Sequence, residues 1–230
     1  MRHTIHAPIL AKIIVAENTL EVVFGIPESN FSFTAGQYVS ITLPGLEGER
    51  IMDKFHDFSI ASSPSYKDSI AIVFRVSKSI FKTALISLPV GAMVTIEGPK
   101  GVFTLPEPIP ASLVLIAGGV GVAPFLSMMR FAVENQTPYH ITFVYFNSTL
   151  ESTAYRGALD ELSRQNNLIS VRYILGSVEQ KHLIVDGENS KEALYYVAGP
   201  PGMVSRVMQE LHNLGILDAQ VRAEEFTGYE

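Results

Sequence analysis

A short apolar run that ends in a cluster of glycines constrains the fold of this chain more than any other feature of its sequence. The aliphatic residues 113–117 are followed by Gly118, Gly119 and Gly121, and residues 125–134 then carry apolar side chains at helical spacing. This pattern predicts a buried strand, a tight turn and a helix. Glycines let a ligand approach the backbone closely, and the free N–H groups at a helix start attract anions. The stretch therefore predicts a strand–turn–helix unit that can hold a phosphate group.

The glycine turn departs at one position from the common dinucleotide-binding pattern. In G-x-G-x-x-G the third glycine allows the helix and the strand to pack closely, and Pro124 occupies that place here. Taken alone, the stretch is also compatible with an ordinary strand–helix connection. The rest of the chain has to distinguish these two interpretations.

Strands and helices alternate in the chain after this turn. Predicted strands cover residues 112–117, 140–146, 169–175, 193–198 and 219–226, and predicted helices cover residues 123–134, 153–164 and a stretch that ends near residue 214. Such alternation is typical of a parallel sheet, here of five strands, with helices on both faces. Ligands bind such sheets at the carboxyl ends of the strands. We therefore expect the turns at 118–124, 147–149 and 199–203 to converge on one site.

The first part of the chain shows short alternating apolar runs instead. Predicted strands cover residues 9–15, 20–24, 38–43, 58–61, 69–76 and 93–97, and one helix is predicted at 80–88. Six short strands separated by turn residues are typical of an antiparallel barrel or sandwich. Pro106, Pro108 and Pro110 then interrupt both patterns, and a proline-rich stretch is typical of a stiff linker. The sequence thus predicts two domains, residues 1–106 and 111–230.

The composition limits where the chain acts and what it binds. With 47% hydrophobic and 17% charged residues, the chain can bury a substantial core. No apolar run approaches the roughly 20 residues that a membrane span needs, and the N-terminus lacks the apolar stretch of a signal peptide. We therefore expect a cytoplasmic protein without a membrane span. The net charge of −6 and the lack of a basic cluster disfavour a nucleic-acid partner.

The cysteine and histidine content excludes further kinds of site. The sequence contains no cysteine, which rules out a disulfide, a cysteine nucleophile and a cysteine-ligated iron–sulfur cluster within the chain. The six histidines are scattered, and none forms a pair at i, i+4 spacing. No metal site is therefore expected.

Five motifs follow one another along the chain. They are residues 31–41 (FSFTAGQYVSI), 58–64 (FSIASSP), 97–103 (EGPKGVF), 118–124 (GGVGVAP) and 198–203 (AGPPGM). In this order they resemble the ferredoxin–NADP reductase superfamily, over essentially the whole chain from about residue 8. The resemblance implies an N-terminal antiparallel six-stranded β-barrel that binds a flavin, followed by a C-terminal α/β domain that binds a nicotinamide dinucleotide. It identifies the chain as similar to standalone bacterial-type members without an iron–sulfur domain.

The resemblance implies that one barrel strand carries flavin-binding residues. The family motif R-x-Y-S-x-x-S falls on residues 56–62, so that His56, Phe58, Ser59 and Ile60 are expected at the flavin. Phe58 would pack on the flavin ring, and Ser59 would hydrogen-bond near its reactive nitrogen. An aromatic face and a hydroxyl group suit these two roles.

The phosphate side of this motif departs from the family. His56 replaces arginine and Phe58 replaces tyrosine, and the first change removes a permanently charged phosphate clamp. If His56 faces phosphate, flavin binding should tighten as the pH falls toward about 6; the alternative is a histidine at a strand end or at the surface. The start of the short helix is the second phosphate element, where Lys82, Thr83 and backbone N–H groups would hold the anion. The alternative for Lys82 is a solvated helix residue.

The resemblance also implies where the nicotinamide dinucleotide lies. The residues expected to contact it are Gly118, Gly119, Gly121, Pro124, Gly199, Pro200 and Met203. The first four would surround the pyrophosphate, and the last three would lie beside the nicotinamide. Ala198 stands where the family has a cysteine, which we expect to alter rates rather than to abolish hydride transfer.

Asn147 is expected beside the adenosine ribose. No Asp or Glu ends the strand at 140–146 to bind a ribose 2′-hydroxyl, and Glu151 comes several residues later. This removes one reason to reject a 2′-phosphate without providing a group that binds it. Arg156 and Arg172 are candidates for that role, and the alternative for both is an ordinary surface arginine.

The end of the chain resembles the terminal strand of the family. That strand often carries a carboxylate and an aromatic residue near the flavin, and Glu224 and Phe226 fit by spacing. Glu224 would relay a proton, and Phe226 or Tyr229 would shield the flavin ring. Because chain ends are often flexible, Phe226 is preferred over Tyr229.

These features predict a flavoprotein oxidoreductase that transfers hydride from NAD(P)H to a bound flavin. FAD is the expected cofactor, with FMN as the alternative, and a separate acceptor protein such as a ferredoxin would receive the electrons. A second hypothesis is an NAD(P)H:flavin reductase that takes free flavin as its substrate. A third is a redox-silent binding or regulatory subunit, because His56, Phe58 and Ala198 all depart from the family pattern.

Overall fold

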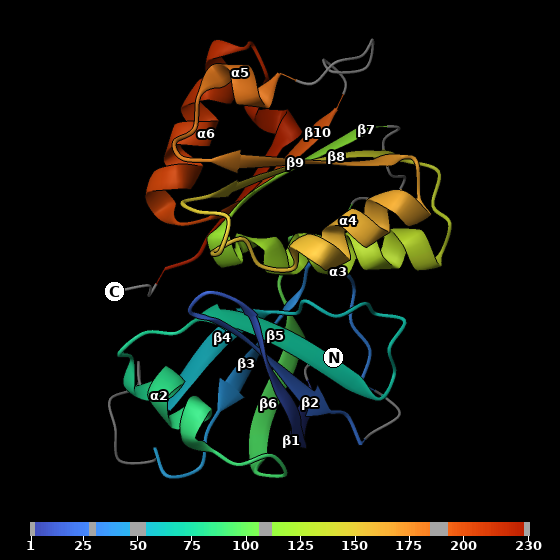
Figure 1. The fold of residues 1–230 in the computed structure, drawn as a ribbon. Coiled ribbons are helices and arrows are strands. Elements are labelled where there is room, and N and C mark those ends of the chain that lie inside the picture. Colours follow the sequence, from blue (N-terminus) through green and yellow to red (C-terminus); the bar gives the residue numbers. More distant parts are fainter. Residues whose placement is uncertain (1–2, 28–30, 47–53, 106–111, 185–192, 228–230) are drawn as a thin grey trace.

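The computed structural model describes residues 3–27, 31–46, 54–105, 112–184 and 193–227. Two sheets organise it, one antiparallel with six strands and one parallel with five strands, as the sequence predicts. Figure 1 shows the antiparallel sheet below and the parallel sheet above. Every strand of the first sheet ends by Lys100, and every strand of the second begins at or after Ser112. The predicted linker at 106–111 lies outside the described residues.

The antiparallel sheet closes into a barrel. Its strands lie in the order β4-β3-β6-β1-β2-β5. Their bounds are β1 His3–Ala16, β2 Thr19–Gly25, β3 Tyr38–Thr42, β4 Phe55–Ser59, β5 Ser69–Arg75 and β6 Met93–Lys100. A bridge between Ile60 and Ile72 joins the chain after β4 to β5, and the N–H of Ala61 donates to the carbonyl of Ala71 at 2.8 Å. These contacts connect the two edges of the sheet, so that apolar side chains fill its interior.

Helix α2 (Ile80–Ser87) packs against this barrel. Phe81 and Leu85 are buried in the barrel core, as their helical spacing predicts. The ammonium group of Lys12 donates to the carbonyl oxygens of Leu85 at 2.8 Å and Ile86 at 2.7 Å. Since the carboxyl end of a helix carries partial negative charge, this lysine fixes the helix on β1.

The parallel sheet reverses its strand order at its centre. The order is β11-β10-β7-β8-β9, with bounds β7 Ser112–Gly118, β8 His140–Asn147, β9 Ile169–Leu175, β10 Leu194–Gly199 and β11 Val221–Glu225. The chain leaves β7 toward β8 and later returns to the other side of β7 as β10. Ligands bind parallel sheets at such a reversal, beyond the carboxyl ends of the strands. The turn after β7 occupies this position as the 3₁₀ helix η1 (Gly119–Gly121).

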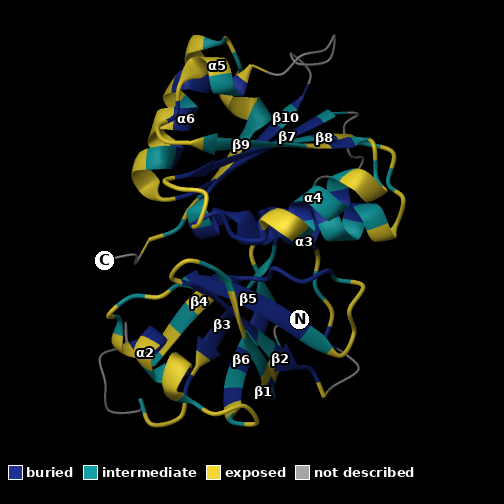
Figure 2. Cartoon of the chain, viewed as in Figure 1, coloured by how far each residue is buried: buried dark blue, intermediate teal, exposed yellow. Residues whose placement is uncertain are grey.

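Helices cover both faces of the parallel sheet (Figure 1). The helices are α3 Val122–Glu134, α4 Arg156–Gln165, α5 Gln180–Leu183 and α6 Pro201–Asn213, and the 3₁₀ helix η2 is Asp218–Gln220. Helices α3 and α4 lie on the face toward the barrel, and α5 and α6 lie on the opposite face. Burial follows this layering, because the strands and α3 are largely buried while α5 and α6 expose their outer sides (Figure 2). The sequence pattern did not predict the short helix α5.

Contacts between the two halves explain where α4 begins. The helix starts at Arg156 instead of the predicted residue 153, because Tyr155 adopts a left-handed conformation with φ 59°. Its hydroxyl donates to the carboxylate of Glu21 on β2 at 2.7 Å. The hydroxyl of Ser127 on α3 donates to the carbonyl of Ser62 at 2.6 Å. These contacts fix the α/β half on the barrel.

Candidate functional site

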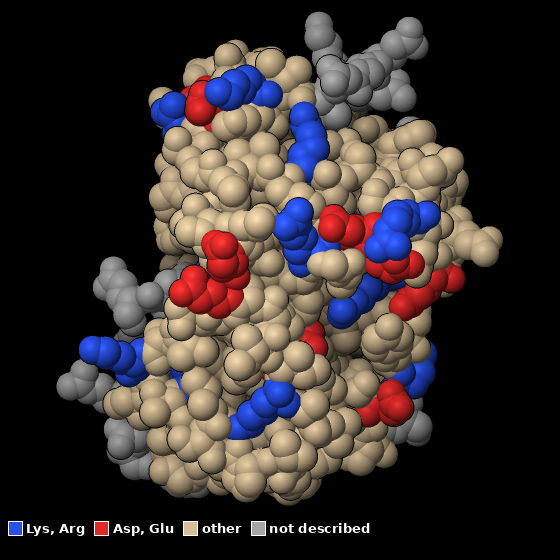
Figure 3. Space-filling view, viewed as in Figure 1, with Lys and Arg blue, Asp and Glu red and all other residues tan. Residues whose placement is uncertain are grey.

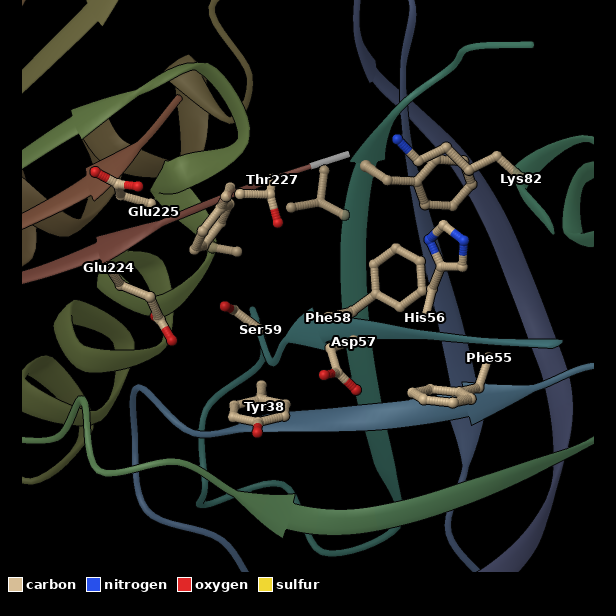
Figure 4. A pocket seen from close by; sticks show the side chains of 14 residues that line it. Tyr38, Phe55, His56, Asp57, Phe58, Ser59, Lys82, Glu224, Glu225 and Thr227 are labelled. Carbon is tan, nitrogen blue, oxygen red and sulfur yellow. The ribbon is translucent and has the colours of Figure 1, made fainter. Parts of the chain in front are cut away.

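The larger of two described cavities lies where the barrel meets the end of β11. Its volume is about 550 Å³. It is lined by Tyr38, Phe55, His56, Asp57, Phe58, Ser59, Val73, Phe74, Lys82, Ala123, Glu224, Glu225, Phe226 and Thr227, and Figure 4 shows these side chains. Strands β4 and β5, helix α2 and the chain end thus build one cavity from segments far apart in the sequence. Its size and its aromatic wall suit a flat heteroaromatic ligand.

Aromatic rings form the barrel wall of this larger cavity. The ring centroid of Phe58 lies 5.8 Å from that of Phe74. The imidazole of His56 stacks on Phe81, with centroids 4.5 Å apart and an interplanar angle of 21°. Strand β4 therefore presents His56 and Phe58 on the same side, because residues two apart on a strand share a face. The stacked imidazole is part of an aromatic cluster.

Lys82 supplies a buried positive charge to the same wall. Its side chain is 4% exposed, although it belongs to the first turn of α2. Figure 4 shows it passing above the ring of His56. Burial lowers the pKa of Lys82 from its ordinary value, because a charge is less stable away from water. A buried cation at a helix start is suited to bind an anionic group.

Glu224 places an unpaired carboxyl oxygen at the opposite wall. Its Oε2 atom is buried and has no hydrogen-bond partner among the described residues, and burial raises the pKa of Glu224 to about 7. The hydroxyl of Ser59 lines the cavity from the end of β4, and the side chain of Ser59 is buried. Both groups can exchange hydrogen bonds with a polar ligand atom.

This carboxyl group predicts a pH-dependent stability. The carboxyl of Glu224 ionises near pH 4.5 when unfolded and near pH 7 when folded. Between these values the folded state binds more protons, so the free energy of unfolding falls as the pH rises from 4.5 to 7. In Glu224→Gln, the free energy of unfolding should fall less over this pH range, by about 1–2 kcal/mol.

Urea unfolding from pH 5 to 8 at constant FAD measures this effect. The exposed neighbour Glu225 provides the control Glu225→Gln, which should keep the wild-type pH dependence. Parallel curves for wild type and Glu224→Gln would contradict the expectation.

The smaller cavity lies at the carboxyl ends of β7, β8 and β10. It has a volume of about 420 Å³. It is lined by Glu17, Arg75, Gly119, Val120, Ser148, Thr149, Ser152 and Pro200. The turns after three neighbouring strands converge here, as the sequence predicts for a ligand site. The barrel adds Arg75 from the end of β5 and Glu17 from the turn between β1 and β2.

The glycine turn brings η1 against β10. A Cβ atom on Gly121 would lie 2.2 Å from the carbonyl oxygen of Ala198, so only glycine fits there. A Cβ atom on Gly118 would lie 3.1 Å from the sulfur of Met203. Gly119 has φ +54°, and the guanidinium of Arg75 lies 3.8 Å from the position of a Cβ atom at Gly119. The cation therefore faces the turn where a phosphate would approach the backbone.

The structure brings most of the predicted site residues to these two cavities. Those that line the larger one are His56, Phe58, Ser59, Lys82, Glu224 and Phe226. Gly119 and Pro200 line the smaller one. Gly118, Gly121 and Met203 pack directly behind Gly119 and Pro200. A hydrogen bond from the N–H of Phe226 to the carbonyl of Gly199, at 2.9 Å, connects the neighbourhoods of the two cavities.

Besides Gly118, Gly121, Gly199 and Met203, four further predicted site residues line neither cavity. Ile60 is fully buried and closes the barrel through its bridge to Ile72. Thr83 is exposed on α2, and Pro124 is buried in the first turn of α3. Asn147 is buried at the end of β8, and its side-chain amide has no hydrogen-bond partner among the described residues. Tyr229 lies outside the part of the chain that the structure describes.

The two arginines considered for a 2′-phosphate also lie away from the smaller cavity. The guanidinium of Arg156 lies 5.7 Å from the ring centroid of Tyr173. Both terminal nitrogens of Arg172 donate to the carbonyl of Ile184 at 3.1 Å. Neither residue is part of the lining of the smaller cavity.

Sequence patterns did not identify the barrel residues that reach the smaller cavity. Arg75 ends β5 and Glu17 follows β1, so both resemble ordinary charged residues at strand ends. The only sequence signal was their position beside a turn. Tyr38 was likewise within a recognised motif (31–41) without being assigned a role.

Two kinds of feature, a membrane-spanning helix and a metal-binding cluster, are absent from the residues that the structure describes. None of the helices in the described ranges is both long enough and apolar enough to cross a membrane. Within those same ranges, no three His, Cys, Asp or Glu side chains gather as a metal site would require. On the face in Figure 3, acidic and basic side chains are interspersed and form no single basic surface.

Two family models match successive parts of the chain. Residues 6–105 match the oxidoreductase FAD-binding domain, and residues 115–209 match the oxidoreductase NAD-binding domain. The first match contains the barrel wall of the larger cavity. The second contains the glycine turn of the smaller one.

Curated relatives are similar at about one quarter identity. A flavohemoprotein from Oceanobacillus iheyensis is 25% identical over 87% of this chain and 53% of its own length. An NADH-cytochrome b5 reductase 1 from Laccaria bicolor is 25% identical over 90% of this chain and 72% of its own length. The toluate 1,2-dioxygenase electron transfer component of Pseudomonas putida is 26% identical over 86% of this chain and 60% of its own length. The chain thus spans about half of the flavohemoprotein and three fifths of the dioxygenase component.

Solved structures share the fold. A cytochrome P450 reductase from Amycolatopsis superposes with a TM-score of 0.86 at 21% identity, covering 100% of this chain and 71% of that one. A ferredoxin-NADP+ reductase from Plasmodium falciparum superposes with a TM-score of 0.77 at 15% identity, covering 97% of this chain and 96% of that one.

Proposed function

Because this chain belongs to the ferredoxin–NADP reductase superfamily and is an NAD(P)H-dependent oxidoreductase with FAD as its cofactor, we propose that it passes electrons from NAD(P)H through FAD to a separate protein acceptor such as a ferredoxin. The observation that carries this proposal is the arrangement of the two cavities. Adjacent residues line the two cavities, since Phe74 lines the aromatic larger one and Arg75 the glycine-lined smaller one, and the N–H of Phe226 donates to the carbonyl of Gly199, the residue before Pro200. Two ligands bound there would have their reacting ends close together.

The residues that line the larger cavity are of types that would bind FAD. His56, Phe58 and Phe226 offer aromatic faces to the flavin ring, and Lys82 offers a cation to a phosphate. The unpaired Oε2 of Glu224 indicates a polar partner that the protein itself does not provide. When bound, FAD accepts a hydride and releases electrons.

Ser59 and Glu224 are proposed to hydrogen-bond the polar edge of the ring. The hydroxyl of Ser59 can donate or accept, which suits an atom that changes its protonation. Glu224, with a pKa of about 7, can hold or release a proton near neutral pH. Phe226 covers the ring from the α/β half and excludes water from it.

The smaller cavity is proposed to hold the nicotinamide dinucleotide. Backbone N–H groups at Gly119–Gly121 lie at the start of α3, where anions bind. Pro200 lines this cavity beside the glycine turn, and Arg75 lies opposite Gly119. A pyrophosphate between the glycine turn and Arg75 would be bound by N–H groups on one side and by a guanidinium on the other.

One observation favours free flavin as the substrate instead. His56 stands where relatives carry arginine, and its ring stacks on Phe81 at 4.5 Å. Strand β4 therefore offers no permanent charge to a flavin phosphate, which favours a flavin that dissociates. The redox-silent hypothesis is set aside because both matched domains are oxidoreductase domains.

An absorption spectrum of the purified protein separates these functions. We expect a bound flavin that is bleached by NAD(P)H without oxygen and reoxidised by added ferredoxin. A colourless protein that oxidises NAD(P)H only with free flavin would establish the flavin reductase instead. A protein that does neither would overturn both.

Arg75 is expected to contribute to binding of either nucleotide. Since a pyrophosphate is common to NADH and NADPH, Arg75→Gln should raise the KM of both by roughly tenfold and change kcat little. Steady-state kinetics with each nucleotide measures this. Arg164→Gln is the control, because Arg164 is exposed and paired with Glu161. Unchanged KM values in Arg75→Gln would remove this residue from the site.

A further inference from the structure

The smaller cavity is lined by one charged side chain of each sign. Among the described residues that line it, Arg75 is the one cation and Glu17 the one carboxylate. Arg75 faces the glycine turn, 3.8 Å from the position of a Cβ atom at Gly119. The loop after β8 contributes Ser148, Thr149 and Ser152, whose hydroxyls are uncharged. The one carboxylate of the lining therefore comes from Glu17 of the barrel.

The position of Glu17 is fixed by contacts across the two halves. Its N–H donates to the carbonyl of Glu151 at 2.8 Å, which joins the β1–β2 turn to the loop after β8. The hydroxyl of Thr19 donates to the carbonyl of Glu17 at 3.0 Å, and Asn18 adopts a positive φ of 51°. The barrel therefore contributes a carboxylate beside the turn that follows β8, where β8 itself ends without one.

This placement has a consequence for the adenosine end of a dinucleotide. A ribose 2′-hydroxyl donates a hydrogen bond well to a carboxylate, whereas a 2′-phosphate is repelled by it. Arg156 and Arg172, the other candidates to neutralise such a phosphate, interact with Tyr173 and Ile184 away from this cavity. Arg75 lies at the pyrophosphate position proposed above.

We infer that this chain uses NADH in preference to NADPH, and that Glu17 of the barrel sets the preference. The inference rests on the proposed function of the smaller cavity as the nucleotide site. The recognition group comes from the β1–β2 turn, so the flavin-binding half would select the nucleotide that the α/β half binds. Glu17 is exposed, and its substitution should leave the fold unchanged.

Two measurements test this inference. The first is kcat/KM for NADH and NADPH with the FAD-loaded protein, where we expect wild type to favour NADH by about tenfold or more. The second is calorimetric binding of AMP and of 2′-phospho-AMP, which requires no turnover. Glu17→Gln should reduce the preference about threefold to tenfold, mainly by improving the phosphorylated ligand. Glu17→Lys should reduce it further.

Glu151→Gln is the matched control. It removes one charge from a neighbour whose backbone carbonyl accepts from the N–H of Glu17 and which does not line the cavity, so the preference for NADH should stay. Equal use of both nucleotides by wild type, or a preference unchanged in Glu17→Gln, would overturn the inference while the proposed function stands. If neither nucleotide reduces the flavin and neither AMP compound binds, the proposed function itself fails.

Discussion

Lys82→Met is expected to weaken FAD binding by roughly 30-fold to 100-fold, the value of a charge-assisted hydrogen bond to a buried phosphate. Lys82 is 4% exposed and lines the larger cavity, so water screens its charge little. Methionine keeps most of the length of the side chain and removes the charge together with its N–H donors.

Fluorescence titration of the flavin-free protein with FAD measures this loss. Lys78→Met is the matched control, since Lys78 is exposed four residues earlier, and its affinity should change less than about twofold because an exposed charge is screened. An equal loss in both variants would indicate a general electrostatic effect. Unchanged affinity in Lys82→Met would remove Lys82 from the phosphate site.

The pH dependence of FAD affinity distinguishes Lys82 from His56. Burial lowers the pKa of Lys82, so its charge persists below that value and is lost as the pH rises through it. If Lys82 is the clamp, affinity should be constant below this lowered pKa and fall as the pH rises through it. If His56 is the clamp, affinity should fall between pH 6 and 8. Asp57 and Glu224 also line the cavity, so Glu224→Gln should be titrated in parallel.

Gly121→Ala is expected to destabilise the protein by about 3 kcal/mol. The added Cβ atom would lie 2.2 Å from the carbonyl oxygen and 2.6 Å from the carbonyl carbon of Ala198. These are backbone atoms of β10, which pairs with β7, so a side-chain rotation cannot relieve the overlap. Either η1, which lines the smaller cavity, or β10, which ends beside it, has to move.

Urea unfolding compares Gly121→Ala with the control Gly157→Ala. Gly157 lies in α4, and a Cβ atom there would meet nothing within 4 Å. Since alanine favours helix over glycine, the control should be neutral or more stable by up to about 1 kcal/mol. A Gly121→Ala variant as stable as wild type would show that the turn does not need glycine at this position.

The architecture followed from the sequence because it depends on local patterns. Alternating apolar residues gave the six barrel strands, and strand–helix alternation gave the five-stranded parallel sheet. Helix α2 was predicted within one residue of its end, since Phe81 and Leu85 lie at helical spacing. The start of α4 was wrong by three residues. The backbone of Tyr155 is left-handed, and its hydroxyl donates a hydrogen bond to Glu21, a residue 134 positions away. A partner so distant leaves no signal in the local sequence.

The sequence likewise predicted one part of the candidate site and left another part to the tertiary structure. Motif order selected Ser59 and Glu224, which line the larger cavity, and the glycine turn, which lines the smaller one, because these predictions depend on residue type and position within an element. Sequence alone left Lys82 open between a ligand and a solvated residue, and its burial in the larger cavity depends on how α2 packs on the barrel. Ile60 belongs to the same motif as Phe58, yet it lies just beyond the end of β4, where its bridge to Ile72 closes the barrel.

The sequence by itself determined the two sheets, the glycine turn and the family, since these depend on periodicity, on residue size and on the order of motifs. Only the tertiary structure decided that Arg75 and Glu17 of the barrel line the cavity behind the glycine turn. Both residues lie at strand ends, where sequence allows any charged side chain. Their neighbours come from the other half of the chain, and only the packing of α3 and α4 on the barrel brings those neighbours within reach.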